Sequence, residues 1–241
     1  MTFSKWQALG NTYLLVERAE LPEPLTPERA RALSEGQSDG ILEIGANGEV
    51  TVWNPDGSVA EMSGNGARIA AAWLARKLGT DRVTLRFGPR AVGATVDGDS
   101  VVLDAGPVEV GEPESLDVEG ETFEFTPVSV GNPHAVVRRE PTRGELHRLG
   151  PLLERHPRFP NRTNVQLVRV DSPHDLTVLV WERGAGETSS SGTSSVAAAA
   201  AAIANGWCES PVHVHLAGGE LLVELDERGE ARLTGPVVEL A

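Results

Sequence analysis

The sequence predicts a mixed α/β (α+β) fold built from two similar domains, and two observations support this prediction. Most of the chain reads as short segments in which apolar and polar residues alternate with period two, a pattern typical of strands. Two helical segments, residues 69–75 and 196–204, are apolar on almost every side, and each follows a serine and a glycine-containing turn. The order strands, helix, strands therefore occurs twice.

The individual strands and surface helices follow from local signals. Residues 26–36 predict a surface helix with Thr26 as its cap and Pro27 at its first position. Residues 142–157 predict a second amphipathic helix, interrupted around Gly150 and Pro151. The alternating segments include TYLLVE, GEVTVW, RVTLRF, SVVLDAG, NVQLVRV, LTVLVW, VHVHL, GELLVEL and EARLTG.

The two apolar helices are predicted to be buried on all sides, because neither has a polar face. Each is too short to cross a bilayer. Alanine lets other backbone come close, so we expect each helix to run through the middle of a curled sheet and to end at Gly79 or Gly206. We expect the boundary between the two domains to lie at the acidic stretch 106–121. We expect an N-terminal domain of residues 1–106 plus 232–241 and a C-terminal domain of residues 107–231.

Composition limits the class of protein. The 241 residues are 40% hydrophobic and 23% charged, which is ordinary for a soluble globular protein, and the net charge is −14. That charge argues against binding to nucleic acid or to a membrane surface. The start of the chain has no signal-peptide pattern, so we expect a cytoplasmic protein. The single cysteine, Cys208, excludes an internal disulfide and fits a small buried side chain.

The starts of the two apolar helices are the first candidate site. The N-terminus of a helix attracts anions, and the turns Gly64-Asn65-Gly66 and Gly192-Thr193-Ser194 would let a ligand approach the free N–H groups. Two such starts could grip one anion, or could place Ser63 and Ser191 on opposite sides of one carbon atom. Ordinary helix capping by serine is the alternative interpretation.

Further polar residues lie where strands are expected to end. Each alone is typical of a turn, but together they could bind a small zwitterion with an ammonium and a carboxylate group. A metal site is not expected, because His213 and His215 share a strand face without a third ligand. The polar residues are Asn11, Asn54, Asn132, His134, Asn164, Glu182 and Arg183.

With these motifs the chain resembles diaminopimelate epimerase, in the superfamily of cofactor-independent amino-acid racemases and epimerases. The pieces ALGNTYLLVE, WNPDGSVAEMSGNGAR, VSVGNPHAVV, RTNVQLV and WERGAGETSSSGTSSVAAAA occur in the family's order and cover nearly the whole chain. The resemblance implies two pseudo-symmetric domains, each a barrel-like, mostly antiparallel sheet around a central helix.

The resemblance also implies an activity and a set of site residues. The activity is inversion of the α-carbon of LL-diaminopimelate to the meso isomer, without metal or other cofactor, for lysine and peptidoglycan synthesis. The catalytic positions would be Ser63 and Ser191, supported by His134 and Glu182. The partner would be a small amino-acid substrate, and assembly as a homodimer stays open. The substrate contacts would be Asn11, Asn54, Gly64, Asn65, Asn132, Asn164, Glu182, Arg183, Gly192 and Thr193.

The chain departs from the family at the catalytic positions, where the family has cysteine and this sequence has Ser63 and Ser191. A thiol ionises near neutral pH at a helix start, whereas a serine hydroxyl needs an adjacent base. Thr12 also replaces the family's aspartate, and EGQSDG stands at residues 35–40 for a glycine-rich segment.

Four interpretations of the two serines stay open. His134, Glu182 or water could activate the hydroxyls of a divergent epimerase. The chain could act as a racemase or dehydratase on another amino acid. It could bind an amino acid without turnover, or the serines could be an engineered inactive pair.

Overall fold

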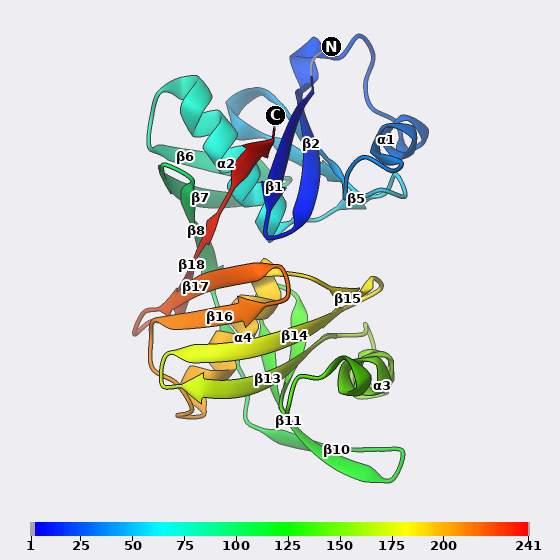
Figure 1. The fold of residues 1–241 in the computed structure, drawn as a ribbon, viewed down its shortest axis with the longest axis vertical. Helices are drawn as coiled ribbons and strands as arrows, with labels where there is room; N and C mark the ends of the chain where they lie inside the picture. Colours follow the sequence, from blue (N-terminus) through cyan, green and yellow to red (C-terminus); the bar gives the residue numbers. More distant parts are fainter. Residues whose placement is uncertain (1–2, 241) are drawn as a thin grey trace. The chain divides into compact units, whose positions relative to one another are not determined.

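The structure, a computed structural model, describes residues 3–240, and the chain divides into two compact units. Unit 1 is Met1–Asp104 with Thr234–Ala241, and unit 2 is Ala105–Leu233. The chain passes between them in two strands, β8 (Ser100–Pro107) and β18 (Glu230–Pro236), shown in Figure 1.

Unit 1 contains a six-stranded sheet and the strands β6, β7 and β8, which pair antiparallel in sequence order. The six-stranded sheet has the order β19-β1-β2-β3-β4-β5, and its one parallel pair, β2 with β3, is connected through helix α1. The elements are β1 (Ser4–Ala8), β2 (Asn11–Glu17), α1 (Pro27–Ser34), β3 (Ile41–Ile44), β4 (Val50–Trp53), β5 (Val59–Ala60), α2 (Gly64–Leu78), β6 (Arg82–Phe87), β7 (Arg90–Asp97) and β19 (Val238–Leu240), with short 3-10 turns at Arg18–Glu20 and Ala46–Gly48.

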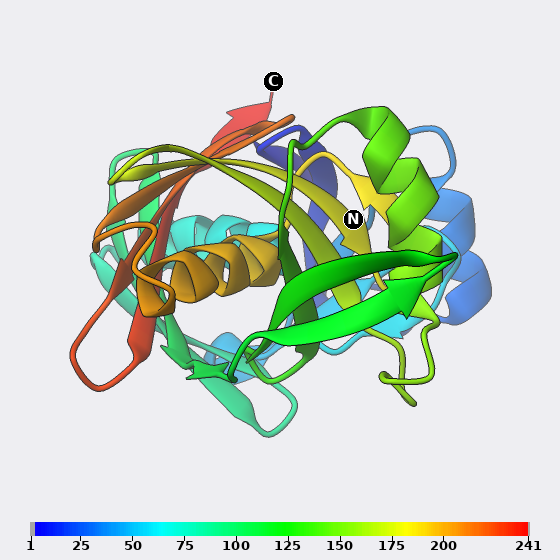
Figure 2. The same ribbon diagram turned by 90° about the horizontal axis from the view of Figure 1, so that it is seen from below.

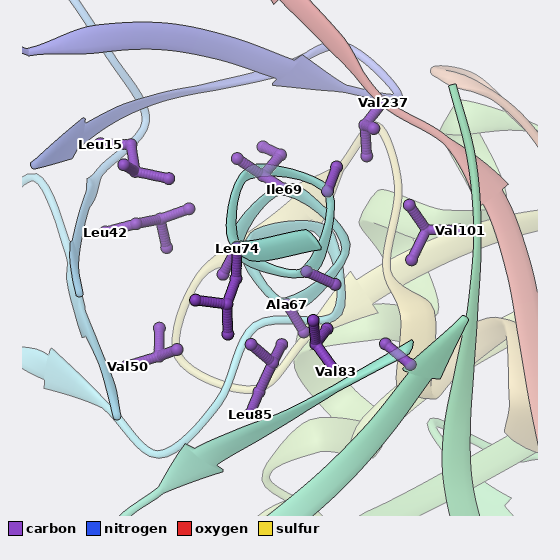
Figure 3. Packing of buried hydrophobic residues seen from close by; sticks show 14 of the residues in the cluster. Leu15, Leu42, Val50, Ala67, Ile69, Leu74, Val83, Leu85, Val101 and Val237 are labelled. Carbon is purple, nitrogen blue, oxygen red and sulfur yellow. The ribbon is translucent and has the colours of Figure 1, made fainter. Parts of the chain in front are cut away.

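Helix α2 forms the centre of unit 1. Figure 3 looks along its axis and shows Ala67, Ile69 and Leu74 among side chains of the surrounding strands, such as Leu42 and Leu85. Ten residues of this helix are buried, and it ends at Gly79, whose φ of 65° is the left-handed conformation that glycine adopts readily. The prediction of a buried helix that stops at Gly79 is confirmed.

Unit 2 repeats this design with more strands. Its sheet has the order β10-β11-β12-β13-β14-β16-β17, with β9 beside β11 and β15 beside β14. The parallel pairs β12–β13 and β14–β16 are connected through helices α3 and α4. The elements are β9 (Glu109–Val110), β10 (Glu114–Val118), β11 (Glu121–Ser129), β12 (Pro133–Arg138), α3 (Arg143–Glu154), β13 (Asn164–Ser172), β14 (Asp175–Glu182), β15 (Gly186–Thr188), α4 (Gly192–Ala204), β16 (Val212–Leu216) and β17 (Gly219–Leu225).

Helix α4 is the central helix of unit 2. It contacts β11, β12, β13, β14 and β17, and Figure 2 shows it in gold beneath the curved strands. Every side chain from Val196 to Ala202 is at most 1% exposed. The predicted fold class, a mostly antiparallel curled sheet around a central helix in each unit, is confirmed.

The surface helices match the prediction at α1 and differ at α3. The Thr26 hydroxyl accepts a hydrogen bond from the Arg29 N–H at 3.3 Å, so Thr26 caps α1 as expected. The expected interruption of the second helix is wrong, because α3 continues through Gly150 and Pro151 to Glu154. A proline removes one hydrogen bond of a helix, and near the end of α3 the packing of Leu149 and Leu153 in the core outweighs that loss.

Cys208 is buried, at 5% exposure, as expected for a small core side chain. Its thiol contacts the Ser172 carbonyl oxygen at 3.6 Å, and burial raises its pKa. Within residues 3–240, no helix combines the length and the apolar character that crossing a membrane requires.

Candidate active site

The helix start in unit 1 has Ser63 as the N-cap of α2. The Ser63 hydroxyl oxygen accepts a hydrogen bond from the Gly66 N–H at 3.1 Å, which is ordinary capping. The same oxygen lies 3.0 Å from the hydroxyl of Tyr13 on β2, and either group can donate. Ser63 is therefore both a cap and one member of a hydroxyl pair.

Further along α2, Arg68 is completely buried. Its Nη2 donates to the Asn65 side-chain oxygen at 2.6 Å, and its Nη1 lies 3.5 Å from the Gly64 carbonyl oxygen. Burial lowers the pKa of Arg68 to about 10, and attraction to Tyr13 acts against this decrease. Because residues 64 and 65 belong to the first turn of α2, the Arg68 side chain holds that turn.

The other unit 1 candidates lie at strand ends. Asn11 is the first residue of β2 and is half-buried. Asn54 follows β4, and its amide donates to the Ser58 hydroxyl at 2.9 Å, so it closes its own turn. The Thr12 N–H donates to the Asp39 carboxylate at 2.7 Å, so a carboxylate is present beside this turn although residue 12 itself is threonine.

The helix start in unit 2 differs from that in unit 1. Ser191 is the N-cap of α4, but its side chain makes no capping hydrogen bond. Its hydroxyl instead bonds to the carboxylate of Glu182 at the end of β14, and Glu182 also accepts a hydrogen bond from Thr188 at 2.8 Å. Burial raises the pKa of Glu182, against the opposing effect of these two hydrogen bonds.

A buried polar network lies on the neighbouring strands of unit 2. The Asn132 side-chain oxygen Oδ1 can only accept, so the His134 Nε2–H donates to it at 2.9 Å, and His134 Nδ1 accepts from the Gln166 side-chain amide at 3.0 Å. Gln166 also donates to the Ser194 hydroxyl of α4 at 3.0 Å. Burial lowers the pKa of His134 to about 3, so this imidazole is neutral at physiological pH.

Asn164 joins this network to Arg183. Its side-chain amide donates to the Pro133 carbonyl oxygen at 2.9 Å, and its side-chain oxygen accepts from the Arg183 N–H at 3.0 Å. Asn164 lies opposite His134 in the parallel pair β12–β13. The structure thus brings together, at one end of the unit 2 sheet, the candidates that the sequence scattered over residues 132–183.

Gly192 and Thr193 form the first turn of α4. Gly192 is buried and Thr193 is half-buried. The Ser191 carbonyl oxygen accepts from both the N–H and the hydroxyl of Ser195, at 3.0 and 2.8 Å. The candidates of unit 2 therefore form one connected group with the helix start.

Sequence reasoning missed Tyr13, Arg68 and Gln166. Gln166 could have been found from strand periodicity, since it lies two residues after Asn164 and so on the same face of β13. Arg68 follows Asn65 by three residues, a spacing at which helical side chains meet. No local signal identifies Tyr13 as a neighbour of Ser63, because 50 residues separate the two.

Solved structures share this architecture. A hydroxyproline epimerase from Agrobacterium vitis, solved with bound trans-4-hydroxy-L-proline, aligns with a TM-score of 0.72 at 15% identity over 99% of this chain and 90% of its own. A predicted epimerase from Pseudomonas aeruginosa aligns with a TM-score of 0.71 at 17% identity over 99% and 96%. The fold is therefore that of the amino-acid racemases and epimerases.

Sequence relatives narrow this class to one family. Diaminopimelate epimerase of Desulfitobacterium hafniense is 37% identical over 98% of this chain and 95% of its own length. Diaminopimelate epimerase 2 of Nostoc sp. is 35% identical over 100% and 94%. The family model for diaminopimelate epimerase matches residues 126–240. The chain belongs to the diaminopimelate epimerase family, which makes it an enzyme of the amino-acid epimerase and racemase class.

Proposed function

We propose that the protein interconverts LL- and meso-2,6-diaminopimelate by removing the α-proton from one face of the carbon and returning a proton to the other. Ser63 and Ser191 exchange these protons directly with the substrate. The reaction would serve lysine and peptidoglycan precursor synthesis, and the place of action would be the cytoplasm. The partner would be a small amino-acid substrate.

The contact between Ser191 and Glu182 carries this proposal. A serine hydroxyl is too weak an acid to exchange a proton without help, and the Glu182 carboxylate is hydrogen-bonded to it. Because burial raises the pKa of Glu182, its carboxylate is a stronger base than an exposed one, and its acid form is more available at neutral pH. The pair can therefore accept a proton in one direction and donate it in the other.

His134 has a different role in this proposal. An imidazole whose pKa is near 3 is a weak base, and both of its nitrogens are already hydrogen-bonded. We assign it to holding Asn132, which would contact the substrate. The other substrate contacts would come from Asn11, Asn54, Gly64, Asn65, Asn164, Arg183, Gly192 and Thr193.

A second candidate function is binding of an amino acid without turnover. The observation that favours it is serine at both positions, since the Ser63 hydroxyl is occupied as an ordinary helix cap. A binder would show saturable affinity for an amino acid but no exchange of its α-proton with solvent.

Proton NMR in D2O separates these functions. The unmodified protein is incubated with LL- or meso-diaminopimelate, and the α-proton signal is followed against a sample without protein. Loss of that signal together with interconversion of the isomers is the expected result. An unchanged signal with both isomers would contradict the proposed reaction, and calorimetric titration with the same compounds would then test the binder.

Two matched variants test the role of the hydrogen bond between Ser191 and Glu182. Glu182→Gln removes the acid–base group but keeps its shape, and it should slow α-proton exchange by about 100-fold or more. Glu187→Gln is the control, because Glu187 pairs with Arg143 and His147 at the surface and should leave the rate unchanged. Equal rates in the wild type and Glu182→Gln would remove Glu182 from the mechanism.

A further inference from the structure

We propose that Tyr13 is the proton-transfer partner of Ser63, as Glu182 is of Ser191, and that Arg68 is a positioning residue that stabilises the anionic form of Tyr13. This inference rests on the proposed function and assigns two residues to it that the sequence did not single out.

The first support is the contact itself. The Tyr13 hydroxyl oxygen lies 3.0 Å from the Ser63 hydroxyl oxygen, within hydrogen-bond distance for direct proton transfer. Tyr13 is only 6% exposed, and its ring packs in the core of unit 1. A hydroxyl pair of this kind, in which Tyr13 is buried and Ser63 is half-buried, can pass a proton directly from one oxygen to the other.

The second support is the buried charge of Arg68. Within residues 3–240, Arg68 forms no ion pair with a carboxylate, and its Nε has no hydrogen-bond partner. A buried charge without a counter-ion is costly, so an anion nearby would stabilise it. Tyr13 is the group whose charge acts on Arg68. By the same attraction, the guanidinium stabilises a phenolate at Tyr13.

Two charged residues on the strands beside Tyr13 lie on the opposite face of the sheet. Tyr13 pairs with Trp6 on β1, and both face α2, where Ser63 and Arg68 lie. Side chains alternate along a strand, so Lys5 on β1 and Glu43 on β3 point away from Tyr13. Glu43 is held there by Arg18 and Trp53. Asp39, which follows α1, binds the Thr12 backbone. On the face that Tyr13 occupies, Arg68 is the completely buried cation, whereas Arg76 lies over the Trp6 ring at 5.1 Å, is exposed and pairs with Glu239.

The proton transfers balance without any other reactant. In one direction, the α C–H bond breaks and its proton goes to the Ser63 oxygen, while the Ser63 hydroxyl proton goes to the Tyr13 phenolate. On the other side of the carbon, Ser191 gives its proton to the α-carbon and takes the proton of a protonated Glu182. The enzyme ends with Tyr13 protonated and Glu182 ionised, which is the starting state for the reverse reaction.

The sequence allows Tyr13 to be observed directly, because it is the only tyrosine in the chain. The increase in ultraviolet absorbance near 295 nm with pH reports phenolate formation at this residue, and circular dichroism at each pH confirms that the protein stays folded. Arg68→Met removes the positive charge and should move the Tyr13 titration to higher pH by about one unit. Arg68→Lys is the control that retains a cation and should move it less. An identical titration in the wild type and Arg68→Met would overturn the role of Arg68.

The rate of α-proton exchange tests the proton transfer. Tyr13→Phe keeps the ring and should slow exchange by about 100-fold, with an unchanged melting temperature within a few degrees. An unchanged rate in Tyr13→Phe would overturn the proposal while the proposed function stands. If the wild type itself shows no exchange, the proposed function and the proton transfer both fail, and the Tyr13 titration still decides whether Arg68 stabilises the phenolate.

Discussion

Ser63 and Ser191 occupy equivalent positions, yet their hydroxyls have different partners. Ser63 caps its helix and contacts a phenol, whereas Ser191 leaves its helix uncapped and contacts a carboxylate. In the proposed reaction, the acid–base group behind Ser63 would therefore differ in acidity from the group behind Ser191. Since neither serine has an isolated hydroxyl, each side has a second group through which a proton can move.

Restoring thiols at both positions tests whether the acid–base atoms limit the rate. We expect the double variant Ser63→Cys with Ser191→Cys to raise epimerisation of diaminopimelate at least about tenfold, because a thiol at a helix N-terminus ionises near neutral pH. Each single variant should gain less. The measurement is isomer interconversion by NMR, and no gain in the double variant would indicate that the substrate is a different amino acid.

His134 makes a prediction about stability. A free histidine has a pKa near 6.5, and burial lowers that of His134 to about 3 in the folded state. The unfolded chain therefore binds more protons between these values, so the free energy of unfolding decreases as pH falls through this window. From pH 7 to pH 5 this group alone should remove about 2 kcal/mol.

Urea unfolding at the two pH values measures this effect. His134→Gln cannot titrate, so the decrease from pH 7 to pH 5 should be smaller in this variant than in the wild type. Equal decreases would show that His134 is not buried in its neutral form.

At the scale of the element, α3 shows why a glycine can lie inside a helix. A Cβ atom on Gly150 would lie 2.6 Å from two ring atoms of Trp181, so the helix packs directly on the indole. The Trp181 Nε1–H donates to the Glu154 carboxylate at 2.8 Å, which fixes the ring. The glycine that the sequence pattern presented as an interruption is the point of close contact between α3 and β14.

Alanine substitutions at the two glycines of α3 should have opposite effects. Gly150→Ala should lower the free energy of unfolding by about 1–3 kcal/mol through overpacking against Trp181. Gly144→Ala, with open space around its Cβ position, should raise it by about 0.5 kcal/mol through helix propensity. Chemical denaturation measures both, and a stabilising Gly150→Ala would contradict the close packing.

The sequence predicts a feature well when the residues that determine it are close together in the chain, and poorly when they are far apart. The cap at Thr26, the stop at Gly79 and the burial of residues 196–202 follow from neighbouring residues, and all were predicted. The predicted burial is wrong at the end of α4, where Ile203 is half-buried and Ala204 is exposed. The continuation of α3 through Pro151 depends on a core that only the folded chain assembles. The contact between Tyr13 and Ser63 joins strand β2 to the start of helix α2, and the two residues are 50 positions apart in the sequence. The local pattern of apolar and polar residues therefore gives no sign of this contact. The roles of the site residues stay predictions.

At the scale of the whole molecule, we propose that the two units are folding domains. Unit 2 is continuous in sequence and has its own apolar core, which includes Phe125, Leu149 and Leu167. A fragment of residues 105–233 should therefore unfold in one cooperative urea transition, followed by the fluorescence of Trp181 and Trp207. The same fragment carrying Leu167→Asp is the control that should not fold. A gradual, non-cooperative change in the unsubstituted fragment would contradict the proposal.

The alanine run of α4 also limits how this chain can diverge. Six consecutive alanines, residues 197–202, are at most 1% exposed, and the helix contacts β11, β12, β13, β14 and β17. A larger side chain at these positions would overpack the core of unit 2. Neutral drift and selection for new specificity can therefore act on the loops around this helix, while the segment that holds Ser191 in place tolerates almost no change.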